Sequence, residues 1–109
     1  MNPLEARFMW LMVFFDLPVG TKNERRHATR FRNALKKDGF LMLQFSVYAR
    51  VCRAQEGVDK HLKRLRTSLP PAGSVRTLQV TDKQFERMKL LVSDSKKTEQ
   101  KAPEQMVLL

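Results

Sequence analysis

The sequence predicts an α+β fold in which one sheet packs against helices. Three observations support this prediction: a continuous apolar run near the N-terminus, two segments with apolar residues at helical spacing, and several short stretches rich in β-branched and aromatic residues. The chain has 109 residues, which suits one small core. Its single cysteine, Cys52, excludes an internal disulfide and fits a reducing compartment.

The first strand and the first helix are expected to follow one another directly. Residues 8–15 have the sequence FMWLMVFF, and a run without polar residues is typical of a strand buried on both faces. A proline and a glycine then indicate a turn. Thr21 and Glu24 form a capping-box pattern at the start of a helix, which is expected to end at Gly39 in a left-handed cap.

The middle of the chain is expected to supply two more strands and the second helix. Residues 40–52 are too long for a typical single strand, so we predict two short strands with a tight corner over residues 44–46. The second helix is predicted from apolar residues at i, i+4, i+7 and i+11. These residues are Val58, Leu62, Leu65 and Leu69.

The last elements follow a firm break in the second helix. The sequence PPAG at residues 70–73 ends that helix, and residues 74–80 are predicted to form a strand. A second capping-box pattern at Thr81 predicts a brief helical turn over residues 82–87. Residues 89–92 are expected either to extend this turn or to form an extra edge strand.

The order β-α-β-β-α-β predicts a ferredoxin-like sandwich, with a four-stranded sheet and both helices on one face. We expect residues 1–92 to form this domain and to bind nucleic acid. A chain this small is suited to burying surface against a second copy, so a homodimer is expected. Residues 93–109 are polar apart from a short apolar end, and we expect a flexible C-terminal tail there.

Charge is the strongest overall indication of function. The formal net charge is +10 and the isoelectric point is near 10.4, which favours polyanionic partners, of which nucleic acid is the commonest. No apolar run approaches the roughly 18 residues that a membrane span needs. The N-terminus lacks the pattern of a secretory signal, so we expect a cytoplasmic location and no membrane contact.

The first helix concentrates the positive charge. Its basic residues lie in two adjacent rows, which could follow the phosphates of a duplex without reading bases. An ordinary solvated helix face is the alternative. The candidate nucleic-acid-binding residues are Lys22, Arg25, Arg26, Arg30, Arg32, Lys36 and Lys37.

Asp16 is the candidate catalytic and metal-binding residue. It ends the most hydrophobic segment of the chain, directly before a turn and a helix. Carboxylate oxygens are preferred ligands of Mg²⁺ and Mn²⁺, but one aspartate cannot assemble a hydrolytic metal site. Two copies that face each other across a dimer axis could do so, with the ion at the dimer interface. The alternative is a carboxylate that caps the turn after Pro18.

Other residues with potential chemistry have weaker support. His27 and His61 have no partner at ligand spacing, so a structural zinc site is not predicted. Cys52 lies in an apolar segment and is expected to fill space in the core. Most aromatic side chains are also expected to belong to the core rather than to stack on bases. They include Phe14, Phe15, Phe40, Phe45 and Tyr48.

Three segments together resemble a known family. VFFDLP, TKNERRHATRFRNALKKDGF and LQFSVYARVC are similar to the CRISPR-associated adaptation proteins of the Cas-two family, most closely the type II form that accompanies Cas-nine. The resemblance covers residues 9–92. It implies a ferredoxin-like homodimer that works with the CRISPR integrase in spacer acquisition. The complex captures short foreign double-stranded DNA, the protospacer. For some members the resemblance implies a metal-dependent endonuclease acting on RNA, including single-stranded RNA, or on double-stranded DNA.

The resemblance also implies roles for particular residues. Asp16 matches the family aspartate at the end of the first strand, the proposed Mg²⁺ ligand. Arg25, Arg26 and Arg30 lie where family members carry basic helix residues. Residues 89–92 would form a strand that crosses to the other subunit. The alternative function is a ferredoxin-fold RNA-binding or regulatory module without a CRISPR role or catalysis, which would expose aromatic side chains on its open sheet face.

Overall fold

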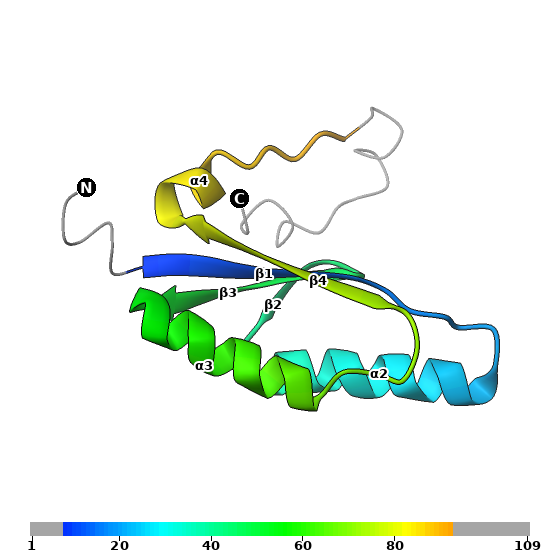
Figure 1. Ribbon diagram of the computed structural model, residues 1–109. Coiled ribbons are helices and arrows are strands. Elements are labelled where there is room, and N and C mark those ends of the chain that lie inside the picture. Colours follow the sequence, from blue (N-terminus) through cyan, green and yellow to red (C-terminus); the bar gives the residue numbers. More distant parts are fainter. Residues whose placement is uncertain (1–7, 93–109) are drawn as a thin grey trace.

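The computed structural model describes residues 8–92, which form four strands and three helices (Figure 1). Their order confirms the predicted β-α-β-β-α-β arrangement, with a short helix added at the end. The elements are β1 (Phe8–Asp16), α2 (Lys22–Lys37), β2 (Leu41–Gln44), β3 (Val47–Arg53), α3 (Ala54–Thr67), β4 (Ser74–Thr81) and α4 (Asp82–Glu86).

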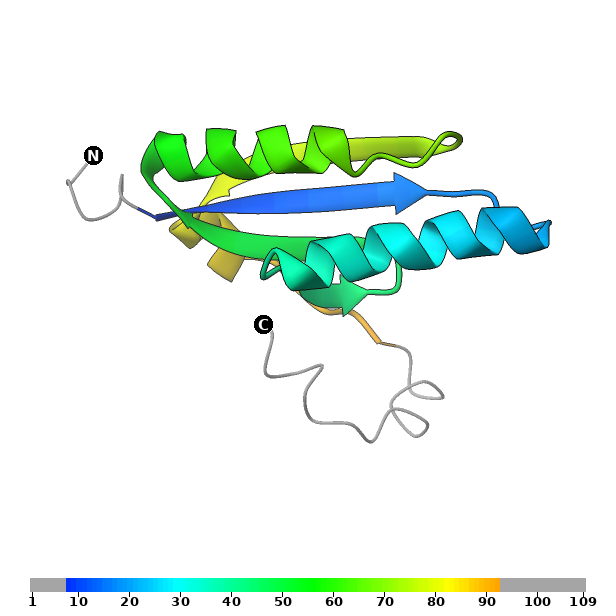
Figure 2. The ribbon, with the colours of Figure 1, turned by 90° about the horizontal axis from the view of Figure 1, so that it is seen from below.

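The strands form one antiparallel sheet in the order β2-β3-β1-β4. The long helices α2 and α3 lie side by side along one face of this sheet, as predicted (Figure 2). The other face, called the open face below, is covered in part by α4 and the segment that follows it (Figure 1). The result is a ferredoxin-like two-layer fold.

β1 lies at the centre of the sheet, and its side chains alternate between the two faces. Leu11, Val13 and Phe15 belong to the core beneath the helices, whereas Met12 packs with Phe85 of α4 on the open face. All five side chains are at least nine-tenths buried. The prediction of a strand buried on both faces is therefore confirmed for the centre of β1.

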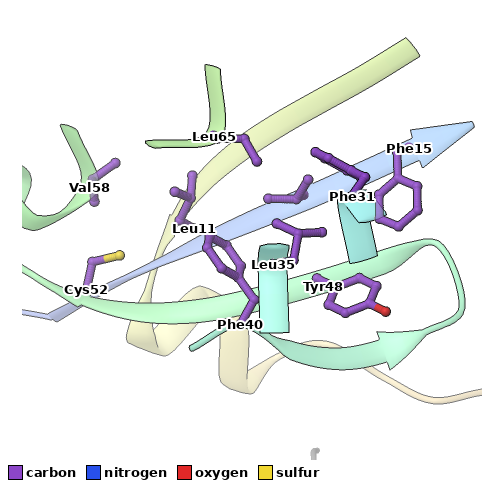
Figure 3. Packing of buried hydrophobic residues seen from close by; sticks show 10 residues of the cluster. Leu11, Phe15, Phe31, Leu35, Phe40, Tyr48, Cys52, Val58 and Leu65 are labelled. Atoms are coloured by element: carbon purple, nitrogen blue, oxygen red, sulfur yellow. The ribbon is translucent and has the colours of Figure 1, made fainter. Parts of the chain in front are cut away.

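The main core fills the space between the sheet and the two long helices (Figure 3). Phe15 packs edge-on against Phe31 of α2, with ring centroids 5.1 Å apart. Such an edge-to-face pair stabilises the packing beyond the area that it buries. The cluster consists of Leu11, Val13, Phe15, Phe31, Leu35, Phe40, Tyr48, Cys52, Val58 and Leu65.

The second helix ends earlier than its apolar spacing predicted. Val58 and Leu65 are buried in the core, but α3 stops at Thr67 and Leu69 is 49% exposed. The prediction that Leu69 continues the apolar face is therefore wrong. The reason is Pro70, because the residue before a proline is driven out of the helical conformation.

Both ends of α2 have the predicted caps. Thr21 accepts a hydrogen bond from the Glu24 amide at 3.1 Å, and the Glu24 carboxylate accepts one from the Thr21 amide at 2.9 Å. At the other end Gly39 has φ +86°, and the Phe40 amide donates to the Leu35 carbonyl at 3.0 Å. This left-handed turn satisfies the last carbonyls and directs Phe40 into the core.

Two predictions for connecting segments have different outcomes. The tight corner between β2 and β3 is confirmed at Phe45 and Ser46. Within the single chain, residues 89–92 neither continue α4 nor pair with a strand. A strand that crosses to a second copy stays a prediction, and the proposed tail over residues 93–109 lies outside the described residues. No helix in the part of the chain that the structure describes is long and apolar enough to span a bilayer.

Candidate nucleic-acid interface

α2 turns its apolar stripe to the sheet and its basic residues outward. Ala28, Phe31 and Leu35 are buried. Six of the seven candidate basic residues are exposed, and Arg32 is half-buried. The only acid within the helix, Glu24, is held in the N-terminal capping box. The exposed residues are Lys22, Arg25, Arg26, Arg30, Lys36 and Lys37.

The seven basic side chains do not all have the same freedom. Arg25 donates to the carbonyls of Val19 and Gly20 at 3.1 and 3.4 Å, so it braces the loop between β1 and α2. Arg32 stacks on an aromatic ring. Among the described residues, the other five have neither a hydrogen-bond nor an ion-pair partner. These five, called the free cations below, are Lys22, Arg26, Arg30, Lys36 and Lys37.

One aromatic residue departs from the predicted core. Phe15, Phe40 and Tyr48 are buried as expected, and Phe14 is half-buried on the open face. Phe45 is 68% exposed, so its assignment to the core is wrong. It occupies the corner between β2 and β3, where the chain reverses and leaves most of the residue open to solvent.

Asp16 is the last residue of β1 and is exposed, which places its carboxylate at a strand end as predicted. Strand alternation puts Asp16 on the same side as Phe14, the open face. No group among the described residues donates a hydrogen bond to its carboxylate. The alternative interpretation, a carboxylate that caps the turn after Pro18, is therefore wrong.

One chain does not by itself provide a metal site at Asp16. The described residues contain no group of three or more histidine, cysteine, aspartate or glutamate side chains that could hold an ion. A single monodentate or bidentate carboxylate falls short of the oxygen ligands that Mg²⁺ or Mn²⁺ requires. Residues of a second copy would be needed to complete the set.

The basic helix and Asp16 lie on opposite sides of the sheet. α2 covers the side of Phe15 and Phe31, whereas Asp16 shares the open face with an apolar groove of about 460 Å³. A phosphate held on the outer side of α2 is therefore separated by the sheet from Asp16 of the same chain. The groove is lined by Met12, Phe14, Leu43, Gln44, Val47, Met88, Lys89, Leu90 and Leu91.

Two other residues that we considered for chemistry have structural roles. Cys52 is buried in the core, as predicted, and burial raises the pKa of its thiol. His61 is 4% exposed and bonds to Asp38 and Arg50. Sequence analysis missed this contact because the partners lie 23 and 11 residues away along the chain.

A ferredoxin-like fold with a helix face of one charge sign defines this chain as a small, strongly basic α+β domain. Comparison with known proteins makes the assignment specific. Residues 9–88 match the family model described as CRISPR associated protein Cas2. The chain therefore belongs to the Cas2 family, which confirms the resemblance in its sequence.

Individual relatives agree with this assignment. A protein of Paracidovorax avenae is 50% identical over 102 residues, 94% of either chain. One from Acidovorax ebreus is 54% identical over 84 residues, 77% of this chain and 82% of the relative. One from Flavobacterium psychrophilum is 49% identical over 86 residues, 79% of this chain and 75% of the relative. All three bear the name CRISPR-associated endoribonuclease Cas2.

Proposed function

We propose that this protein acts in CRISPR spacer acquisition as a homodimeric scaffold that binds duplex DNA together with the CRISPR integrase. The free cations on α2 are the observation that supports it. They lie along a helix of 16 residues, which is about 24 Å long and so matches several successive phosphates of a duplex. Lysine and arginine side chains that meet phosphates position a protein without reading sequence, as a scaffold for varied foreign DNA requires.

The binding experiment reverses the charge of two free cations. Arg26→Glu together with Arg30→Glu should weaken duplex binding at least tenfold and flatten its dependence on salt, because each lost phosphate contact removes about 0.9 from the slope of log K against log salt concentration. The control is Lys60→Glu together with Lys63→Glu on α3. It makes the same change in net charge, but on an exposed helix face that also carries Glu56 and Asp59. Equal losses in the two variants would contradict a binding surface on α2.

The homodimer is proposed to form on the open face. The apolar groove lies there, and Leu78, Leu90 and Leu91 are 51%, 43% and 88% exposed. Apolar surface of this kind marks an interaction site. Light scattering should give twice the chain mass for the parent protein and a monomer for Leu91→Asp. Copurification with the integrase should be lost in the same variant, since the scaffold binds as a dimer.

A metal-dependent endonuclease is the second candidate function, and Asp16 supports it. Its carboxylate is exposed and unpartnered among the described residues, and it shares a face with the proposed dimer contact. Two copies of Asp16 at that interface would together hold Mg²⁺ or Mn²⁺, which would supply a Lewis acid and an activated water. Relatives carry the name endoribonuclease. The substrates proposed are single-stranded RNA and double-stranded DNA.

Asp16 variants separate the two functions. Asp16→Asn should abolish Mg²⁺-dependent cleavage of both substrates and leave duplex affinity unchanged. Spacer acquisition that survives in this variant would show that the scaffold is sufficient. Cleavage at the parent rate would contradict the role of the paired aspartates. The assignment to the Cas-nine-associated form stays a prediction, which the identity of the neighbouring genes would test. The cytoplasmic location also stays a prediction.

A further inference from the structure

Phe45 is the aromatic residue that the fold leaves most open to solvent. It lies at the two-residue corner between β2 and β3, with 68% of its surface exposed. The corner is attached to the sheet, because the Phe15 amide donates to the Ser46 carbonyl at 3.1 Å. Figure 2 shows this corner beside α2. A large aromatic ring is therefore displayed from a fixed position next to the basic helix.

Arg32 of α2 holds the ring in place. Its guanidinium carbon lies 3.7 Å from the centroid of the Phe45 ring, and its Nε donates to the Phe45 carbonyl at 3.3 Å. The same guanidinium lies 5.4 Å from the ring of Phe15, which is in the core. Arg32 thus occupies one face of the Phe45 ring. Since most of the residue remains exposed, the other face is open to solvent. We call this pair the corner stack.

The surroundings of the corner stack are cationic. Lys36 follows Arg32 by one helical turn, so the two side chains share a row of α2, and Lys36 is exposed. Burying the open ring face under an apolar protein surface would bring these charges out of water at a cost. A nucleotide avoids this cost, because its base can cover the ring while its phosphate pairs with the cations.

We propose that the corner stack binds an unpaired nucleobase of the nucleic acid whose phosphates lie along α2. The inference rests on the proposed function, since it assumes that α2 binds a polynucleotide. Bases inside a duplex are stacked on their neighbours and have no free face to offer. An unpaired base has a free face, whether it belongs to a single-stranded overhang of a DNA duplex or to single-stranded RNA. A ring that is already held by Arg32 loses little conformational freedom on stacking.

Phe45→Leu tests the proposal, because it keeps an apolar side chain and removes the aromatic face. Three labelled probes are compared: single-stranded RNA, a DNA duplex with five-nucleotide overhangs, and closed circular duplex DNA, which has no ends. Phe45→Leu should weaken binding to a probe with unpaired bases roughly tenfold and leave the circular duplex unchanged, since stacking of one base on an aromatic ring contributes about that much. Phe45→Trp should restore binding. Leu69→Ala, another exposed apolar side chain, is the matched control.

A spectroscopic readout reports the stacking itself. 2-Aminopurine in the overhang or in the RNA should lose fluorescence on binding to the parent protein and to Phe45→Trp, but not to Phe45→Leu. The probe that shows this change identifies which nucleic acid supplies the base. Two results would overturn the corner stack. One is that the parent protein and Phe45→Leu bind both probes with unpaired bases equally well. The other is that Phe45→Leu loses as much affinity for the circular duplex as for those two probes. A dimer that falls apart in Phe45→Leu would instead assign the ring to a protein contact and overturn it too.

The outcomes also separate this inference from the proposed function. If the parent protein binds none of the three probes, the scaffold itself fails. If it binds all three and only the aromatic dependence is missing, the scaffold stands and the corner stack is wrong. Thermal unfolding of each variant, followed by circular dichroism, verifies that the affinities compare folded proteins.

Discussion

The Asp38 carboxylate and the His61 imidazole are joined by a hydrogen bond of 2.7 Å between Oδ2 and Nδ1. It connects the end of α2 to the buried side of α3. Arg50 Nε donates to the other ring nitrogen at 2.8 Å, so Nδ1 carries the proton that His61 shares with Asp38. Arg64 donates to the second carboxylate oxygen at 2.8 Å. These four side chains form one polar cluster beside the core.

Asp38 should make folding stability depend on pH in the acid range. Burial by itself raises the pKa of this carboxyl, but the hydrogen bonds from His61 and Arg64 and the positive charge of Arg64 outweigh it, so the pKa falls below its ordinary value of 3.8. A lowered folded-state pKa stabilises the protein above about pH 4, and this stabilisation is lost as the pH falls through the folded-state value. Asp38→Asn, which cannot ionise, should be less stable than the parent near neutrality.

The measurement is urea unfolding of the parent and Asp38→Asn from pH 2 to pH 6. The difference in free energy of unfolding should be about 2 kcal/mol at pH 6, as expected for hydrogen bonds to a charged group, and should shrink below pH 4. Asp59→Asn on the exposed side of α3 controls for loss of a carboxylate. A difference for Asp38→Asn that stays constant across the range would contradict the lowered pKa.

His61 should be important for stability, because it is buried and bonds to two other members of the polar cluster. His61→Phe fills a similar volume but leaves Asp38 and Arg50 without their partner, and His61 is 4% exposed. Unmet buried polar groups cost about 1–3 kcal/mol each, so we expect a loss of about 3 kcal/mol in the free energy of unfolding. His27→Phe is the matched control, because His27 makes no hydrogen bond with the described residues. Similar losses in both variants would show that the polar cluster contributes nothing.

The elements that depend on nearby residues could be predicted from the sequence. The capping boxes at Thr21 and Thr81, the left-handed turn at Gly39 and the apolar stripe of α2 all formed as expected. Each depends on residues within about four positions of one another, so the sequence contains the whole interaction. The apolar run of β1 also predicted a strand buried on both faces, and the centre of β1 is buried in this way.

The features that sequence analysis missed depend on which segments meet in space. The Asp38–His61 contact joins residues 23 positions apart, and no local pattern marks such a pair. Phe45 has the composition of a core residue, and only the corner geometry exposes it. The sequence identified Asp16 and the basic helix separately but could not show that the sheet lies between them. That separation follows from strand alternation together with the side on which α2 packs.

Two glycines should respond in opposite ways to the same substitution. Gly73 has φ +98°, and a Cβ there would lie 2.6 Å from the Asp16 carbonyl oxygen and 2.8 Å from Leu17 Cδ2. Gly73→Ala should therefore lower the free energy of unfolding by about 2–3 kcal/mol, through the left-handed backbone and the displaced end of β1. Gly57 lies within α3, where a Cβ would have nothing closer than 3.5 Å.

Gly57→Ala should stabilise the protein by about 0.5–1 kcal/mol, because alanine loses less backbone entropy in a helix and finds ordinary contacts there. Chemical unfolding of both variants gives the two values directly. Destabilisation by Gly57→Ala would mean that α3 packs more tightly against Cys52 than the structure shows. A neutral Gly73→Ala would contradict the close approach of this turn to Asp16.

Asp16 itself should contribute little to folding. Its carboxylate is exposed and accepts no hydrogen bond from the described residues, so Asp16→Ala should change the free energy of unfolding by no more than about 0.5 kcal/mol. Asp38→Ala, which removes a carboxylate that is hydrogen-bonded to both His61 and Arg64, should cost several times more. Urea unfolding of the two variants measures this contrast. A small loss in Asp16→Ala would agree with a carboxylate that is not needed for folding, whereas a large loss would assign Asp16 a structural role in the turn.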